Sequence, residues 1–283
     1  MIQHILFPVD FSAPSLATGP VVARWARSFG ARVTLVHAFG PMAFSTVENP
    51  LLVADLARLN EASRQRLAHC LEDELKGLPV DRVLVEGNTV DAICSHARDH
   101  QVDLIMMPTM GYTRFRQLML GSVTAGVLHD SEIPVWTDAH IDASPIDANP
   151  SSIVCAVDCG PQTVAVVRYA QMLGRHFNAR LKVVHSNPKV SKYFPSGIAS
   201  SAHSFAVNSA QKDYQATVAQ LLDAPALEIL EGESISSDII SAIQQNQADL
   251  LVIGRGHGQG VLGRLRSNAH DLIRLAGCPV VSF

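Results

Sequence analysis

The chain has 283 residues, of which 47% are hydrophobic and 17% charged, and its formal net charge is −4. This composition excludes a disordered chain, which needs low hydrophobicity and high charge, and it offers no basic surface for nucleic acid or anionic lipid. At about 150 residues per domain, the length predicts roughly two domains. No run of 18 or more apolar residues occurs, so we expect no membrane span. Five scattered cysteines indicate thiols in a cytoplasmic protein rather than a disulfide framework.

Five short apolar blocks of the first half recur in the same order in the second half, at nearly constant spacing. The opening sequence MIQHILFPVDFS lacks the features of a signal peptide and predicts a first strand. Each block is rich in Val, Ile and Leu, which is typical of strands buried on both faces. The blocks lie at residues 5–10, 32–37, 85–93, 102–108 and 133–136, and again at 153–158, 180–185, 230–240, 248–254 and 278–281.

Segments with apolar residues at helical spacing alternate with these blocks. The first spans residues 12–29, with Ser12 as a plausible N-cap and Gly30 as a stop signal. The longer connections at 39–50 and 186–208 share little with each other, and the second is rich in Ser and Ala. Further helices are predicted at 55–75, 90–100 and 124–129 in the first half, and at 163–177, 236–245 and 269–275 in the second.

This alternation predicts parallel sheets with right-handed crossovers and helices on both faces. We therefore predict an α/β protein of two repeated, doubly wound, Rossmann-like domains at residues 1–139 and 151–283, joined by a polar linker at 140–150. In such sheets ligands bind beyond the carboxyl ends of the strands, where the strand order reverses.

A glycine-containing loop follows the fourth apolar block of the first repeat. It reads PTMGYTRFRQLMLGS, with nine residues between Gly111 and the pair Gly121 and Ser122. Glycines after a strand let backbone N–H groups approach a phosphate, helped by the N-terminus of the next helix. The alternatives are that Gly111 is an ordinary loop glycine, that Ser122 only caps a helix, and that Asp10 only caps the helix after the first strand.

With this loop, the signature PVDFS at residues 8–12 and the LVH ending of the second strand, the chain resembles the universal stress protein family in its tandem form. Nucleotide-binding members of that family carry G-x2-G-x9-G-[ST] after the fourth strand. The resemblance implies ATP or a related adenine nucleotide as ligand, with or without Mg²⁺. It also implies that the last strands of the two repeats, 133–136 and 278–281, pair antiparallel, so that the chain is a fused pseudo-dimer.

The resemblance also assigns candidate binding residues by position. Those near the adenine and ribose would be Pro8, Val9, Asp10, Ala38 and Met107; those near the phosphates would be Gly111, Gly121, Ser122, Val123 and Thr124; their counterparts in the second repeat would be Asp158 and Gly254.

Both loops depart from the family pattern. Pro108 stands where the first glycine is expected, and a proline has no N–H to donate. The loss of one hydrogen bond to a charged group would cost about 1.5–3 kcal/mol, or roughly ten- to a hundredfold in affinity. In the second repeat Gly254 restores that glycine, but the G-[ST] pair is absent and Arg255, Arg264 and Arg266 make the loop basic.

No catalytic motif accompanies these loops. His96 and His100 have the spacing of zinc ligands on a helix, but no third ligand is apparent, so we interpret them as helix histidines. We therefore predict a cytoplasmic stress-response regulator that binds an adenine nucleotide mainly in the first repeat and acts on a protein partner, as a monomer or homodimer, with at most slow ATP hydrolysis. The alternatives are a ligand-independent adaptor with both loops degenerate, or an enzyme of a related fold such as an adenylyl transferase.

Overall fold

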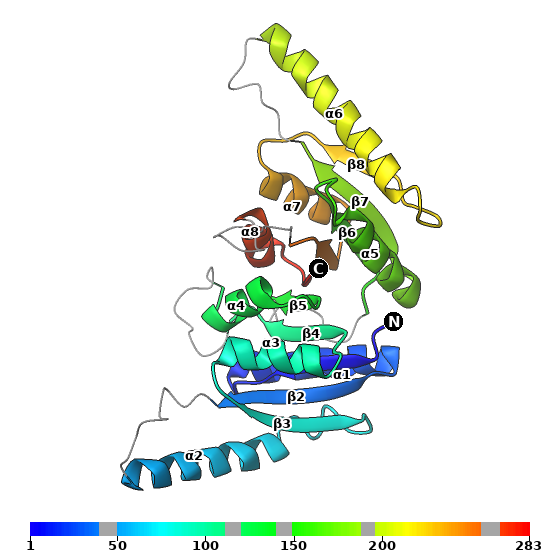
Figure 1. Ribbon diagram of the computed structural model, residues 1–283. Helices are drawn as coiled ribbons and strands as arrows, with labels where there is room; N and C mark the ends of the chain where they lie inside the picture. Colours follow the sequence, from blue (N-terminus) through cyan, green and yellow to red (C-terminus); the bar gives the residue numbers. More distant parts are fainter. Residues whose placement is uncertain (40–49, 111–119, 140–148, 188–195, 256–266) are drawn as a thin grey trace. The chain divides into compact units, whose positions relative to one another are not determined.

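A computed structural model describes residues 1–39, 50–110, 120–139, 149–187, 196–255 and 267–283. The chain divides into two compact units, Met1–Ala148 and Asn149–Phe283 (Figure 1). Within the described ranges, no helix combines the length and the apolar character needed to cross a bilayer. Most of the predicted linker, residues 140–148, lies outside the described residues, and the pairing of the last strands across the two units stays a prediction.

Unit 1 is a five-stranded parallel sheet with the strand order β3-β2-β1-β4-β5. All five residues of both β1 and β4 are buried, as expected for central strands. Its strands are β1 (His4–Pro8), β2 (Arg32–Phe39), β3 (Val80–Glu86), β4 (Leu104–Pro108) and β5 (Val135–Asp138). Its helices are α1 (Ala13–Phe29), α2 (Pro50–Ala68), α3 (Thr89–Asp99) and α4 (Ser122–Asp130).

Unit 2 repeats this topology in the order β8-β7-β6-β9-β10, again with parallel pairing throughout. Its strands are β6 (Ser152–Ala156), β7 (Arg180–Ser186), β8 (Leu227–Leu230), β9 (Leu250–Ile253) and β10 (Val280–Ser282). Its helices are α5 (Thr163–Phe177), α6 (Ser196–Val218), α7 (Ile235–Gln245) and α8 (Ser267–Leu275).

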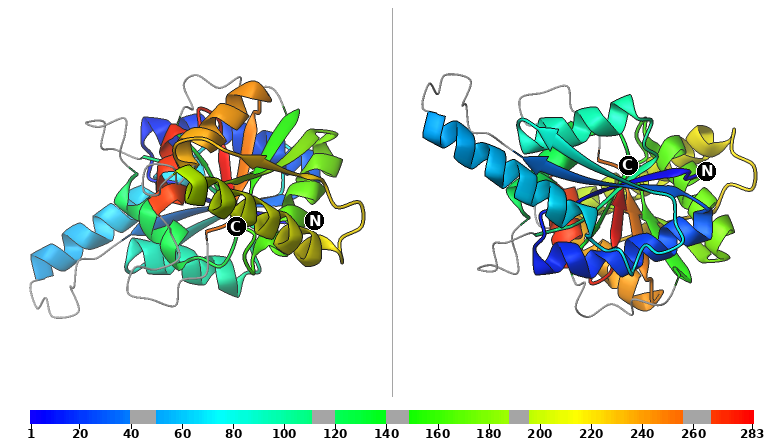
Figure 2. Two further views of the ribbon diagram at one scale, coloured as in Figure 1. Left: turned by 90° about the horizontal axis from the view of Figure 1, so that it is seen from above. Right: turned by 90° about the horizontal axis from the view of Figure 1, so that it is seen from below.

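Helices cover both faces of the sheet in unit 1. Figure 2 (right) shows α1 on one side of β1 and β2, and α3 on the other side. Gly126 of α4 lies against Val90 of α3, which lets the two helices of that second face approach closely. The doubly wound α/β fold predicted from the alternating blocks is therefore confirmed, in two copies.

Helix ends follow the local sequence where a capping residue is present. The Ser12 hydroxyl accepts the Ser15 N–H (3.3 Å) at the start of α1, and Gly30 ends that helix at φ +64°. The bounds of α5 are those predicted. The predicted helix at 55–75 is wrong at both ends, because α2 begins at Pro50 and stops at Ala68.

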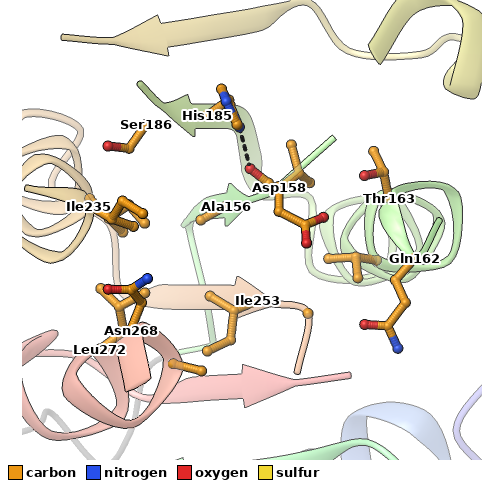
Figure 3. A pocket seen from close by; sticks show the side chains of 15 residues that line it. Ala156, Asp158, Gln162, Thr163, His185, Ser186, Ile235, Ile253, Asn268 and Leu272 are labelled. Carbon is orange, nitrogen blue, oxygen red and sulfur yellow. Dashed lines mark hydrogen bonds between the residues drawn. The ribbon is translucent and has the colours of Figure 1, made fainter. Parts of the chain in front are cut away.

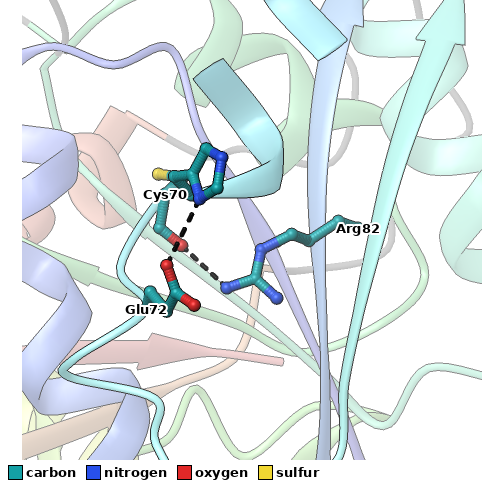
Figure 4. Close-up of polar contacts among 4 residues, drawn as sticks. Cys70, Glu72 and Arg82 are labelled. Atoms are coloured by element: carbon teal, nitrogen blue, oxygen red, sulfur yellow. Dashed lines mark hydrogen bonds and ion pairs between the residues drawn. The ribbon is translucent and has the colours of Figure 1, made fainter. Parts of the chain in front are cut away.

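The polypeptide turns after α2 through a left-handed Leu71, at φ +54°. Figure 4 shows how this turn is held: Arg82 on β3 donates from Nη2 to the Cys70 carbonyl (3.0 Å). An arginine that satisfies a carbonyl beyond the helix end fixes the chain to the sheet there. A contact with the next strand therefore holds the chain just beyond the end of the helix.

The helix α6 begins inside the segment 186–208 that the sequence analysis treated as a connection. Its buried residues Ala210, Tyr214 and Val218 are four apart and form one face. The Tyr214 hydroxyl also donates to the Pro225 carbonyl (2.7 Å). The weak amphipathic pattern of this segment did not predict the helix. One face of its C-terminal half is buried against the rest of the unit.

Candidate functional site

Unit 1 has a cavity of about 300 Å³ at the carboxyl ends of its strands, where the strand order reverses between β1 and β4. This is the position at which doubly wound sheets bind ligands. Its lining includes nine of the predicted residues: Pro8, Val9, Asp10, Ala38, Met107, Gly121, Ser122, Val123 and Thr124. The tenth residue predicted for this repeat, Gly111, lies outside the described residues.

The backbone pairing between the two central strands, β1 and β4, ends early in this unit. We call the line along which these two strands pair the seam. The strand β1 pairs with β4 only at Ile5–Leu104 and Leu6–Ile105. Further along the seam stand Pro8 and Pro108, which have no N–H to contribute to the ladder. The two strands therefore end without pairing to each other, although each stays paired with its outer neighbour, and both prolines line the cavity.

The orientation of the Pro108 nitrogen follows from its neighbours in β4. Ile105 donates its N–H to the Pro134 carbonyl and Thr109 to the Asp138 carbonyl, both toward β5. Because backbone groups alternate along a strand, an N–H at position 108 would point to the other side, into the crevice beside β1. Pro108 therefore lacks an N–H group that would otherwise point into the cavity.

The turn from β1 into α1 is held by three features. The His37 ring donates from Nδ1 to the Val9 carbonyl (2.7 Å), and the Asp10 Oδ1 atom accepts the Ser12 N–H (2.9 Å). Phe11 between them has a left-handed backbone at φ +62°. Such a conformation costs about 1–3 kcal/mol for a non-glycine residue and is common at ligand sites. The side chain that caps α1 is Ser12, so Asp10 is not the cap and faces the cavity.

The N-terminus of α4 meets the same cavity. Its N-cap, Gly121, has no side chain to accept hydrogen bonds, and the first bond inside the helix runs from the Ala125 N–H to the Gly121 carbonyl (2.8 Å). The N–H groups of Ser122, Val123 and Thr124 therefore have no acceptor within the helix. Together with the helix dipole they form a site suited to an anion.

Two of the predicted phosphate donors have structural partners instead. The Gly121 N–H is bonded to the Thr109 carbonyl (2.8 Å), and the Thr124 hydroxyl donates to the Pro108 carbonyl (3.0 Å). These bonds tie α4 to the end of β4. The donors that remain for a ligand are the three N–H groups and the exposed Ser122 hydroxyl.

The sequence analysis missed Ser15, which lies in the first turn of α1 and lines the cavity. Its side chain is only 1% exposed, and its hydroxyl has no hydrogen-bond partner in the part of the chain that the structure describes. A serine near a helix start usually hydrogen-bonds to the backbone of that helix, so its residue type did not predict a ligand contact. The missing partner makes Ser15 a candidate ligand contact.

Unit 2 has a smaller cavity, of about 130 Å³, at the equivalent position (Figure 3). Both residues predicted for this repeat, Asp158 and Gly254, line it. The turn is the same as in unit 1: the His185 Nδ1 atom donates to the Val157 carbonyl (2.9 Å), and the Asp158 Oδ1 atom accepts the Gly160 N–H (2.9 Å). Cys159 adopts the left-handed backbone, at φ +56°.

The two histidines with zinc-ligand spacing pack against each other. The His96 and His100 rings are stacked with centroids 3.9 Å apart, and the His100 Nδ1 atom bonds to the His96 carbonyl. Across the described ranges, no cluster of three or more His, Cys, Asp or Glu side chains could hold a metal ion.

Comparisons with known proteins agree with the repeated fold. The model of the Universal stress protein family matches residues 1–137 and 151–282. A universal stress protein of Thermus aquaticus, from the QAH/OAS sulfhydrylase 3′ region, is 30% identical over 136 residues, which cover 48% of this chain and 97% of that protein. Universal stress protein MJ0577 of Methanocaldococcus jannaschii is 27% identical over 155 residues, which cover 48% of this chain and 93% of that protein.

A solved universal stress protein structure from Archaeoglobus fulgidus covers 99% of this chain and 95% of its own. Its TM-score is 0.69 at 17% sequence identity. At that identity the likeness shows the shared fold alone.

Proposed function

Because the chain belongs to the universal stress protein family, we propose that it is a cytoplasmic stress-response regulator whose unit 1 binds ATP or a related adenine nucleotide. The observation that carries the proposal is the N-terminus of α4, where three N–H groups without a partner in the helix meet a cavity at the reversal point of the sheet. The cavity volume of about 300 Å³ lies at the lower end of the range typical of small-molecule sites.

The chemistry of the lining supports a specific orientation of the nucleotide. The phosphates would accept hydrogen bonds from the N–H groups of residues 122–124 and from the Ser122 hydroxyl. The base would lie between apolar side chains that include Ala38, Ile93 and Met107. A ribose hydroxyl would donate to the Asp10 carboxylate, which keeps its Oδ2 atom without a hydrogen bond from the described residues.

The buried hydroxyl of Ser15 supports the same proposal. A buried polar group without a partner is costly, and a ligand that bonds to it removes that cost. The nucleotide would bring Mg²⁺ as the counter-ion of its phosphates. Bound nucleotide would stabilise the loop between β4 and α4 and so change the surface that a protein partner recognises.

Direct analysis of the purified protein tests the proposal. Denaturation should release adenine nucleotide at near-stoichiometric amounts, or the nucleotide-free protein should give a saturable calorimetric titration with ATP and Mg²⁺. Methyl NMR of the full chain should show the ATP-induced shifts at Ile93 and Met107, in the unit 1 cavity. A clean supernatant together with a flat titration would support the ligand-independent adaptor, which the proline at position 108 favours.

A further inference from the structure

The cavity of unit 2 has different walls from its counterpart in unit 1. Thr89 and Thr124 line the first cavity, whereas Ile235 and Ala269 occupy the equivalent positions in the second. At these two positions a threonine side chain in unit 1 is thus replaced by an aliphatic one in unit 2. The aliphatic side chains around the second cavity include Val166, Ile235, Ile239, Ile253 and Leu272 (Figure 3).

One polar group in these walls lacks a partner. The Thr163 side chain, at the first position of α5, is 1% exposed, and within the described residues its hydroxyl forms no hydrogen bond. It stands at the position of Ser15 in unit 1, whose hydroxyl is also unpaired. Buried hydroxyls are normally hydrogen-bonded, so the same exception in both cavities points to a bond with a ligand.

A second polar pair beside the cavity is already satisfied. The Ser186 hydroxyl donates to the Asp238 Oδ2 atom (2.6 Å), which also accepts the Gly232 N–H (3.3 Å). The carboxylate of Asp238 is therefore used inside the protein, and it fixes the end of β7 to α7. The hydroxyl of Thr163 remains the buried group available to a ligand.

Size and charge limit what this ligand can be. The cavity of about 130 Å³ is far below the 300 Å³ at which typical ligand sites begin, and an apolar cavity of about 150 Å³ can hold one benzene molecule. The residues known to line it include no lysine or arginine, while Asp158 contributes a carboxylate at the exposed edge. Among the lining residues that the structure describes, a phosphate or carboxylate ligand would therefore meet the Asp158 carboxylate and no cation.

We propose that the unit 2 cavity binds a neutral molecule the size of a single six-membered ring, whose one hydroxyl or amino group hydrogen-bonds to Thr163. The ring lies among the aliphatic side chains of α5, α7, α8 and β9. This site is separate from the proposed nucleotide site, so the two halves of one chain take ligands of different chemistry.

Methyl NMR on the full-length protein tests this proposal with phenol as the probe. Isoleucine δ1-methyl labels report each cavity separately, because Ile235, Ile239 and Ile253 line the second and Ile93 lines the first. Phenol should shift the three unit 2 signals saturably and leave Ile93 unchanged. Benzene should bind more weakly, and benzoate should not bind.

The variant Thr163→Val separates the hydroxyl from the shape of the side chain. It should weaken phenol binding about three- to tenfold, the usual effect of one neutral hydrogen bond, and leave benzene binding unchanged. Its free energy of unfolding should not fall, because the hydroxyl has no partner to lose in the ligand-free protein. The matched variant Ser15→Ala, at the equivalent place in unit 1, should leave phenol binding unchanged.

Four results would overturn the proposal. The first is that phenol produces no saturable shift, which means that the cavity holds only water. The second is that benzoate binds as well as phenol. The third is that ATP shifts the unit 2 isoleucines and displaces phenol, which makes this a second nucleotide site. The fourth is that Thr163→Val binds phenol like the parent protein. A failure of ATP to bind in unit 1 would affect none of these readings.

Discussion

The two cavities lie in equivalent places of one repeated fold, yet the first is more than twice as large as the second. The pairing between the two central strands differs in a matching way, because it is shorter in the unit with the larger cavity. In unit 1 the two central strands pair over two residue pairs, and in unit 2, from Ile153–Leu250 to Ala156–Ile253, over four. Pro8 and Pro108 stand where unit 2 has Ala156 and Gly254, so the loss of two backbone donors accompanies the wider crevice.

What both units keep is the turn after the first strand, with its aspartate, its left-handed residue and the histidine bonded to a strand carbonyl. This turn supports the sheet in either unit, whatever the ligand. What they do not keep are the side chains that set the volume and polarity of the cavity. The walls of the cavity in a duplicated fold can therefore differ while the framework around it stays the same.

The largest effect is expected for Gly121→Asp, which puts a carboxylate at the start of α4. It should weaken ATP binding at least about a hundredfold, because it repels the phosphates and takes up the N–H groups that would bind them. An aspartate at an N-cap stabilises a helix, so folding should be preserved despite the close approach of the new Cβ to the Thr109 carbonyl, at 3.3 Å. Calorimetric titration with ATP and Mg²⁺ measures the change.

The neutral variant Gly121→Asn is the matched control for charge. It fills the same space and also caps α4, so its loss of affinity should be clearly smaller. If Gly121→Asp binds ATP like the parent protein, the nucleotide does not use the N-terminus of α4, and the contrast between the two cavities must rest on other residues.

The next largest effect is expected at Pro108, beside the seam between β1 and β4. The variant Pro108→Ala restores an N–H that points into the crevice, and it should raise the affinity of unit 1 for ATP by about tenfold. The control Pro79→Ala changes an exposed proline that does not line the cavity, and it should leave the affinity nearly unchanged. A fall in affinity for Pro108→Ala would show that the new N–H pairs with β1 and closes the crevice instead.

The buried pair of unit 2 provides a test of stability. Asp238 is 8% exposed, and its replacement by alanine removes three hydrogen bonds, from Ser186, Gly232 and Ser237, and leaves the Ser186 hydroxyl unpaired. We expect Asp238→Ala to lower the free energy of unfolding of unit 2 by about 1–3 kcal/mol. Hydrogen exchange of the β8 and α7 amides measures this locally.

The double variant Ser186→Ala with Asp238→Ala reproduces the residues of unit 1, which has Ala38 and Ala92 at these positions. It should recover part of the loss, because no hydroxyl is then left unpaired. If the double variant is less stable than the sum of its single variants predicts, the pair is not the source of the effect.

The smallest effect is a dependence of the stability of unit 1 on pH. Burial is the main cause that lowers the pKa of both His4 and His96 below 6.5, and the nearby His100 lowers the pKa of His96 further. The unfolded chain then binds more protons than the folded one below pH 6.5, so unit 1 should lose stability as the pH falls through about 6.5. The equivalent positions in unit 2 are Ser152, Ala242 and Asn246, which do not titrate.

Tryptophan fluorescence reports this difference, because the chain's two tryptophans, Trp25 and Trp136, are both buried in unit 1. Denaturant titrations at pH 7 and pH 5 should give a lower midpoint at pH 5. The variant His96→Ala should reduce the difference between the two midpoints. Equal midpoints at the two pH values would mean that the buried histidines do not control the stability of this unit.

Much of this protein followed from local patterns in the sequence. The repeated apolar blocks predicted the strands because buried parallel strands need continuous apolar residues, and Ser12 and Gly30 predicted the ends of α1 because capping is a local interaction. The nine predicted residues gathered at one cavity because the carboxyl ends of parallel strands meet at one edge of a sheet. The resemblance to a known family, rather than spacing alone, assigned them to adenine, ribose and phosphate.

The tertiary structure decided what depends on contacts between distant residues. The turn after α2 is held by Arg82 of the following strand, and the burial of α6 depends on the surface that it covers. The sequence shows Ser15 and Thr163 as ordinary hydroxyl residues, and only the packing around them reveals that each lacks a partner. The sequence by itself therefore determined a twice-repeated fold and the place of its two cavities. The volume, the polarity and the unpaired groups of each cavity were decided in three dimensions, because they depend on how far strands and helices separate when they pack.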